Sequence, residues 1–170
     1  MKSNLKDYII KQSSFLENDF CDETIIKLQE IEKSEWLKHA YYNNQTGELV
    51  SNGNQELDIT YANHLDNTRV IIEKMWHSIA NYIDSFKYPW FTAWRGFSPI
   101  RYNRYTLNQK MNYHCDHIHS LFDGDRKGIP ILSCLGLLND DYEGGEFFIL
   151  DDLKIELKKG DLLIFPSNFM

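Results

Sequence analysis

The sequence predicts an α+β fold, with helices in the first half of the chain and a β-rich second half. Two observations lead to this prediction: a long helical pattern of apolar residues before Pro89, and a series of short strand-like segments after it. The 170 residues suffice for one domain with a sizeable core, and no shift in composition marks a boundary. We therefore expect a single domain over 1–170, with helical support over about 1–88 and a β core over about 89–170.

Two helices are expected in the first half. Residues 22–33 fit a short helix with Asp22 as its cap. Its apolar positions recur at near-helical spacing and are Ile25, Ile26, Leu28 and Ile31. Residues 66–86 fit a longer helix, which Asp66 or Asn67 can cap. The apolar stripe of this second helix is typical of a face packed on a core and consists of Val70, Ile71, Met75, Ile79 and Ile83.

The segments after Pro89 fit short strands, because each is rich in β-branched or aromatic residues and is bounded by turn residues. The expected strands are 90–97, 100–106, 110–117, 129–138, 145–150, 153–157 and 161–165. So many short strands in sequence predict a barrel or a double-sheet jelly roll. The polar stretch 43–56, which precedes the long helix, is expected to be a loop or a weak hairpin.

Composition excludes several classes of function. The net charge is -7, so the chain offers no basic surface for nucleic acid or an anionic membrane, and we expect neither partner. Cys21, Cys115 and Cys134 are too few and too widely spaced for a zinc site or a secreted disulfide scaffold. No segment approaches the roughly 20 apolar residues of a membrane span, and the first residues do not form a signal peptide. We expect a cytoplasmic protein, and the sequence carries no signal for an oligomeric state.

His114 and Asp116 are the candidate metal ligands. On a strand, residues two apart point to the same face, so the imidazole and the carboxylate of His114-Cys115-Asp116 can reach one ion. Two His and one carboxylate form the facial triad of non-haem iron(II) oxygenases. A His-x-Asp triplet alone is a weak signal, because it also arises by chance on protein surfaces. His117 and His119 have the opposite strand parity, so we expect them at the surface or the entrance of the site.

The order of the residues around this pair strengthens the signal. Tyr105 stands nine residues before His114, and the strand that begins at Ile131 ends in Leu138-Asn139. It is followed by Glu143-Gly144-Gly145-Glu146-Phe147 and by Lys159-Gly160-Asp161-Leu162-Leu163. This series, from about Ile100 to Phe165, resembles the iron(II)- and 2-oxoglutarate-dependent dioxygenases of the prolyl 4-hydroxylase type. The resemblance implies N-terminal helices packed on a double-stranded β-helix (jelly roll).

The resemblance also implies roles for individual residues. His114 and Asp116 would bind Fe(II). Tyr105 would hydrogen-bond a carboxylate of the cosubstrate 2-oxoglutarate, and Ser133 would contact the same cosubstrate; each also has a purely structural interpretation as a side chain of the fold. The implied reaction hydroxylates a C–H bond of a prolyl or other peptidyl residue, or of a small molecule, and releases succinate and CO2, with ascorbate as a further cofactor. The loop 120–130 either helps to choose the substrate or is an ordinary hairpin loop.

Two parts of the family pattern are missing from the chain. In the family, the second His and a basic residue for the far carboxylate of 2-oxoglutarate both follow the strand that matches Gly160 to Pro166. The chain stops at Met170, so we expect part of a longer enzyme, without the last strands of the jelly roll and with weakened iron binding. The alternative is a noncatalytic jelly-roll module that has lost the complete iron site. A cupin-type enzyme is disfavoured, because the local His-x-His spacing of cupins is absent.

Overall fold

The structure is a computed structural model that describes residues 4–43, 46–51, 53–87, 96–112, 114, 116, 130–150 and 152–169. The two α-helices are α1 (Asn18–Glu30) and α2 (Asp66–Phe86). The first five strands are β1 (Ile10–Gln12), β2 (Leu37–Lys38), β3 (Tyr41–Asn43), β4 (Glu48–Val50) and β5 (Asp58–Thr60). The others are β6 (Tyr102–Arg104), β7 (Leu132–Gly136), β8 (Phe147–Ile149), β9 (Leu153–Ile155) and β10 (Leu162–Pro166). Short 3-10 helices cover Leu5–Tyr8, Lys33–Glu35, Gly53–Gln55 and Ser167–Phe169.

Helix α1 begins four residues before the predicted start, so the prediction that Asp22 caps it is wrong. The helix starts at Asn18, and its buried residues are Cys21, Thr24 and Leu28. The expected apolar face holds only in part, since Ile26 is 55% exposed. The first turn of the helix includes Phe20 and Cys21, and both pack in the core.

Helix α2 spans the predicted residues, and Ile71 and Ile79 of its apolar stripe are buried in the core. Val70 was placed on this stripe wrongly, because it is exposed. The predicted cap is wrong as well: Leu65 occupies the N-cap position, and no side chain caps the helix there. Asn67 is instead buried between the helices, where its Nδ2 donates to Thr24 Oγ1 at 2.8 Å.

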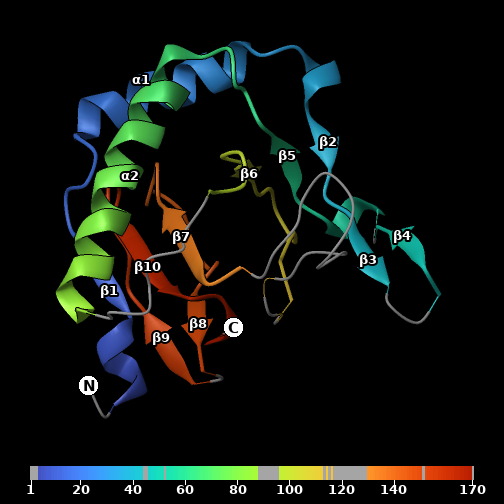
Figure 1. The fold of residues 1–170 in the computed structure, drawn as a ribbon. Coiled ribbons are helices and arrows are strands. Elements are labelled where there is room, and N and C mark those ends of the chain that lie inside the picture. The colour runs from blue at the N-terminus through green and yellow to red at the C-terminus, as the bar shows by residue number, and fades with distance from the viewer. Residues whose placement is uncertain are drawn as a thin grey trace.

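A three-stranded antiparallel sheet in the order β1-β10-β7 joins the two ends of the chain. Ile10 lies opposite Ile164 in this sheet, and Ser133 lies opposite Phe165. Figure 1 shows β10 between β1 and β7, with α2 alongside the sheet. Strands β1 to β5 lie within residues 1–88, where the sequence predicts helical support, and β1 pairs with the final strand. A strand as short as Ile10-Lys11-Gln12 shows no clear alternation of apolar and polar residues, because its stability comes from pairing with strands that are distant in sequence.

The two faces of β10 contact different layers. Leu162 and Ile164 pack into the core that α1 and α2 cover, whereas Leu163 and Phe165 pack into a second core with Ile149. This alternation follows from the two-residue period of a strand, and all four residues are buried because both faces are covered. Residues of the β8–β9 hairpin, which pairs Phe147 with Ile155, contribute to the second core. The central sheet thus lies between a helical layer and a hairpin.

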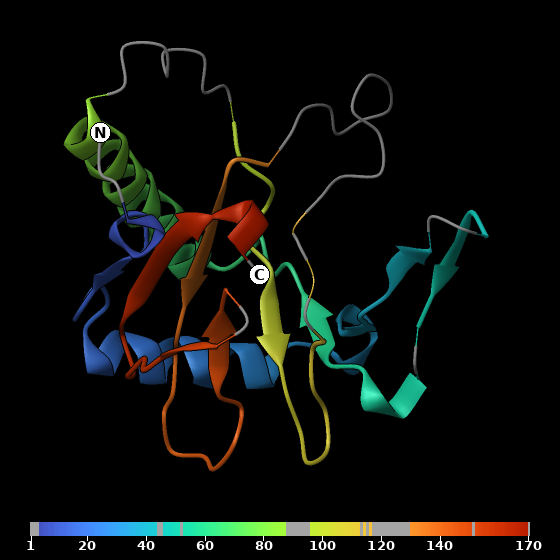
Figure 2. The ribbon, with the colours of Figure 1, turned by 90° about the horizontal axis from the view of Figure 1, so that it is seen from below.

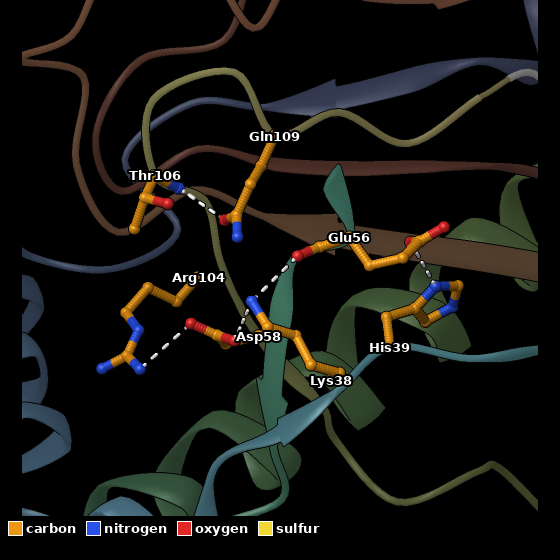
Figure 3. A network of polar contacts seen from close by, with 7 residues as sticks. All are labelled: Lys38, His39, Glu56, Asp58, Arg104, Thr106 and Gln109. Atoms are coloured by element: carbon orange, nitrogen blue, oxygen red, sulfur yellow. Dashed lines mark hydrogen bonds and ion pairs between the residues drawn. The ribbon is translucent and has the colours of Figure 1, made fainter. Parts of the chain in front are cut away.

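The remaining strands form a second sheet, β2-β5-β6, and the β3–β4 hairpin. The hairpin confirms one of the two expectations for residues 43–56. Figures 1 and 2 both show it on the side of the molecule away from α2. A polar network crosses the second sheet, in which Lys38 Nζ lies 2.7 Å from Asp58 Oδ1 and Arg104 Nη2 lies 3.2 Å from Asp58 Oδ2 (Figure 3). Hydrogen bonds from Lys38 and then Arg104 lower the pKa of Asp58.

The α+β class is confirmed, with two helices and small antiparallel sheets, and the described residues form no closed barrel or jelly roll. The predicted strands 100–106, 129–138, 145–150, 153–157 and 161–165 each contain an observed strand. Segment 90–97 lies almost wholly outside the described residues. The described positions of 110–117, which are 110–112, 114 and 116, do not form a strand. Within the described parts of the chain, no helix is long and apolar enough to cross a membrane.

Candidate metal site

Hydrogen bonds hold Asp116 at the end of the central sheet. Its backbone N–H donates to the carbonyl of Ser167, 3.2 Å away, just after β10. Ser133 of β7 donates its hydroxyl hydrogen to Asp116 Oδ2, and its Oγ lies 3.2 Å from Ser167 Oγ. Because Ser133 is paired with Phe165 in the β7–β10 ladder, sheet register brings the serine to this carboxylate. One oxygen of Asp116 is thereby fixed, and Oδ1 remains for another partner.

The His114 ring is oriented by a hydrogen bond at Nδ1. Its Nδ1 lies 2.8 Å from the carbonyl oxygen of Asn112, and a carbonyl only accepts hydrogen bonds, so Nδ1 carries the proton. In the neutral ring, Nε2 therefore has the free lone pair. Nε2 lies 3.4 Å from Asp116 Oδ1. A histidine that donates one N–H to a backbone carbonyl while its other nitrogen faces a carboxylate has the outer-shell arrangement found for metal-binding imidazoles.

The separation between the two acceptor atoms fits a shared cation. Two ligand atoms about 2.1 Å from one metal ion lie about 3.0 Å apart at a right angle and about 3.4 Å apart at a tetrahedral angle. The observed 3.4 Å between Nε2 and Oδ1 lies at the upper end of this range. The side chains of His114 and Asp116 are 37% and 41% exposed, so an ion can reach them from solvent. Imidazole nitrogen and carboxylate oxygen are donors that suit iron(II) and similar divalent metals.

A proton on His114 Nε2 would use the same two atoms, Nε2 and Asp116 Oδ1, that a metal ion would use. The hydrogen bond with Asp116 raises the pKa of His114, while burial opposes this shift and the bond to the Asn112 carbonyl adds to it. The hydrogen bond from His114 lowers the pKa of Asp116, and the bond from Ser133 lowers it further against the effect of burial. The contact between the imidazole and the carboxylate therefore favours the charged form of each group, and a metal ion bound between them would compete with a proton on Nε2.

Tyr105 and Ser133 were expected to contact a cosubstrate. The Ser133 hydroxyl contacts Asp116, and its role toward a cosubstrate stays a prediction. Tyr105 follows β6 and is 48% exposed. Partial burial raises the pKa of its phenol, the charge of Arg101 lowers that pKa, and Glu56 raises it. The charge of Arg101 also contributes a lowering to the pKa values of His114 and Asp116.

A third protein ligand is not found among the residues that the structure describes, since none of them form a group of three His, Cys, Asp or Glu suited to a metal ion. His117, His119 and the loop 120–129 lie outside the described residues. Two other histidines are engaged elsewhere: His39 Nδ1 lies 3.1 Å from Glu56 Oε2 (Figure 3), and His77 Nδ1 lies 2.7 Å from the Glu73 carbonyl.

Sequence reasoning missed three groups that shape the site. Ser167 and Asn112 contribute backbone carbonyls, a role that any residue type can fill, so no sequence signal identifies them. Arg101 stands in the Arg101-Tyr102-Asn103-Arg104-Tyr105 segment, and the available signal was the two-residue spacing from Arg101 to Asn103 and from Asn103 to Tyr105. Comparison with protein-family models and with curated proteins gave no match for this chain.

Proposed function

We propose that this chain carries the metal site of an iron(II)- and 2-oxoglutarate-dependent dioxygenase of the prolyl 4-hydroxylase type. One observation supports the proposal most directly: His114 Nε2 and Asp116 Oδ1 face each other at 3.4 Å, while Asn112 and Ser133 hold the other atom of each group. Two preoriented lone pairs at this distance form two positions of a facial triad. The ordered sequence pattern around them, from Tyr105 to Asp161, supports the family assignment.

In this proposal the residues of the chain hold and orient the reacting groups. His114 and Asp116 bind the metal, and Ser133 prevents rotation of the Asp116 carboxylate by holding Oδ2. When bound, iron(II) together with 2-oxoglutarate and oxygen supplies the hydroxylation of a C–H bond, with release of succinate and CO2. The substrate is a peptidyl residue, such as a prolyl residue, or a small molecule. Ascorbate would serve as reductant, and a reducing cytoplasm would suit the free thiols of Cys21 and Cys134.

The layers of the fold are compatible with a double-stranded β-helix. The β8–β9 hairpin packs on the same face of β10 that carries Leu163 and Phe165. Ser133, opposite Phe165 in the neighbouring strand, lies at the end of that face where Asp116 is attached. We propose that the central sheet and this hairpin are parts of the two facing sheets of a jelly roll, with the metal pair at one end. This placement would open the site toward solvent.

A noncatalytic binding module is the second candidate function. The observation that favours it is the lack of a third ligand among the described residues. A ligand or partner could then occupy the same opening without iron chemistry, because a fold of this kind does not by itself determine function.

Metal titration tests the site itself. Iron(II) would be titrated anaerobically into the parent chain and into His114→Ala and Asp116→Ala. His77→Ala is a matched control, because His77 is also exposed and its Nδ1 also contacts a backbone carbonyl. We expect one site in the parent and in the control, and at least about tenfold weaker binding in the two ligand variants, since even outer-shell changes cost 10- to 100-fold. Equal binding by all four proteins would refute the site.

Turnover separates the two candidate functions. The protein would be supplied with iron(II), ascorbate and 2-oxoglutarate, and succinate would be measured without added substrate. A dioxygenase is expected to release some succinate in this uncoupled reaction, and His114→Ala is expected to release none. If the parent neither binds metal nor releases succinate, the result would favour the binding module.

A further inference from the structure

Ser167 is a buried serine that joins three segments of the chain beside the metal pair. It follows β10, begins the 3-10 helix Ser167–Phe169 and is 2% exposed. Its backbone N–H donates to the carbonyl of Ile131 at 3.0 Å, and its carbonyl accepts the Asp116 N–H at 3.2 Å. Any residue type could form these two backbone bonds, so they give no reason for a serine. The hydroxyl of Ser167 is the chemically specific part of this position.

The hydroxyl of Ser167 donates to Ser133. A serine hydroxyl has one proton and two lone pairs, and an ionised carboxylate only accepts hydrogen bonds. The one proton of the Ser133 hydroxyl is therefore directed to Asp116 Oδ2. Ser133 Oγ lies 3.2 Å from Ser167 Oγ, so the proton of this second bond comes from Ser167. The three side chains form one chain of hydrogen bonds, Ser167–Ser133–Asp116, which we call the hydroxyl relay.

The hydroxyl relay fixes the direction in which the Asp116 carboxylate faces. It holds Oδ2, while Oδ1 lies 3.4 Å from His114 Nε2. Without the Ser167 hydroxyl, Ser133 would lose the bond at its oxygen, and rotation of the Ser133 side chain would release Oδ2. Hydrogen bonds in series also polarise and strengthen one another where water is excluded, and Ser167 is buried at the start of the relay. The orientation of one metal-binding oxygen thus depends on a hydroxyl two hydrogen bonds away.

We propose that Ser167 is a positioning residue, whose hydroxyl orients the Asp116 carboxylate toward His114 Nε2 through Ser133. This role deepens the proposed function and rests on it for the identity of the metal ion. The family resemblance implies a contact between Ser133 and the cosubstrate and gives no role to Ser167. A cosubstrate carboxylate only accepts hydrogen bonds, and the Ser133 proton is engaged with Asp116. Ser133 therefore orients a metal ligand in this chain, and Ser167 holds Ser133 in place.

A double-mutant cycle tests the hydroxyl relay in metal-free protein. The free energy of unfolding would be measured by urea denaturation for the parent, Ser167→Ala, Asp116→Ala and the double variant. Because Ser133 lies between the two side chains, we expect the double variant to lose less than the sum of the single losses. The difference should be at least about twofold in the equilibrium constant of unfolding. The same cycle in a Ser133→Ala background should show additive losses.

Ser78→Ala is the matched control for this cycle. Ser78 is also buried, and its hydroxyl donates to Gln12 Oε1 at 2.8 Å, outside the hydroxyl relay. Its loss should add to that of Asp116→Ala, because sites without shared partners are independent. Additive losses for Ser167→Ala and Asp116→Ala would overturn the relay. A coupling between them that survives in the Ser133→Ala background would overturn it as well, because the coupling would then not pass through Ser133.

Anaerobic iron(II) titration tests the positioning role. We expect Ser167→Ala to bind iron(II) about tenfold more weakly than the parent, at the lower end of outer-shell effects, because Ser167 acts through Ser133. Ser78→Ala should bind as the parent does. Ser167→Thr keeps the hydroxyl and should retain the iron affinity, even where its added methyl group lowers the free energy of unfolding. A purely structural role would instead make iron affinity follow stability.

Two results of the iron titration have different meanings. Equal iron binding by the parent and Ser167→Ala would overturn the positioning role. A parent that takes up no iron would reject the proposed dioxygenase function, and the cycle in metal-free protein would still decide whether Ser167 acts on Asp116 through Ser133.

Discussion

Replacement of Gly160 by alanine should strongly destabilise the fold at the start of β10. Gly160 has φ +82°, and a Cβ built there would lie 2.3 Å from the carbonyl oxygen of Leu16. The obstacle is backbone, and the Leu16 N–H also donates to the carbonyl of Gly160 at 2.9 Å. The segment before α1 must therefore move away from β10 to admit a methyl group.

The cost has three contributions. An L-residue in the left-handed region loses about 1–2 kcal/mol relative to glycine. Overpacking costs about 1–3 kcal/mol more, and a weakened Leu16–Gly160 hydrogen bond adds about 1 kcal/mol. We expect Gly160→Ala to lose about 3 kcal/mol or more, a large share of the roughly 5–15 kcal/mol that stabilises a typical domain.

Gly144 provides a matched control, because it has φ +79° and no atom within 4 Å of a built Cβ. Gly144→Ala should lose only about 1–2 kcal/mol from its backbone conformation. The free energy of unfolding of both variants and the parent would be measured by urea denaturation followed by circular dichroism. Equal losses in the two variants would refute the reasoning, because the close approach to Leu16 would then contribute nothing. If Gly160→Ala fails to fold while Gly144→Ala folds, the clash is confirmed in its most severe form.

Three further predictions concern thiol reactivity, pH and a buried hydroxyl. Burial raises the pKa of the Cys134 thiol to about 12, so native protein at pH 8 should resist alkylation at this residue, as mass spectrometry of peptides with and without denaturant would show. The pKa of His114 is raised in the folded protein, so protonated His114 stabilises the fold below about pH 6.5, and this stabilisation is lost as pH rises through the folded pKa. The pKa of Asp116 is lowered, so ionised Asp116 stabilises the fold above about pH 3.9, and this stabilisation is lost as pH falls through the folded pKa. The pair should thus contribute most between these values, and an NMR titration of Asp116→Asn should show the pKa of His114 fall toward its ordinary value; an unchanged pKa would contradict their contact. Tyr102→Phe should lower the free energy of unfolding by about 1 kcal/mol, because it removes the bond to Thr68 while the Thr68 hydroxyl keeps its bond to Ala62, and no loss in urea denaturation would contradict that contact.

The contact between His114 and Asp116 was predicted from their spacing, although the strand on which that prediction rested is not observed. His114 and Asp116 were expected to share a strand face, yet neither residue is in a strand. Their side chains still meet, because the Asp116 amide is held by Ser167 and the His114 ring is held by Asn112. A separation of two residues keeps two side chains near each other in most extended conformations. The sequence therefore predicted the proximity but not the contacts that produce it.

Errors in the helices have a common cause. The apolar period placed α2 correctly over 66–86, because repeated burial on one face leaves a clear pattern. Capping residues were chosen from local preference, and packing decided otherwise: Asn67 is buried against Thr24, and Lys27 Nζ donates to Asn67 Oδ1 at 2.7 Å. A polar residue that can cap a helix can equally satisfy a buried contact between two helices, and only the position of α1 selects between these roles.

The sequence alone determined the α+β class, the extent of α2, the approximate positions of strands β6 to β10 and the proximity of His114 to Asp116. These features depend on local periodicity and on residues close together in the chain. Only the tertiary structure decided that β1 pairs with β10, that Ser133 hydrogen-bonds Asp116, and that Arg104 pairs with Asp58. These features depend on contacts between residues that are far apart in sequence. Such contacts are made by backbone groups, which every residue has, and by side chains that can bind several kinds of partner, so the sequence does not specify which partner is chosen.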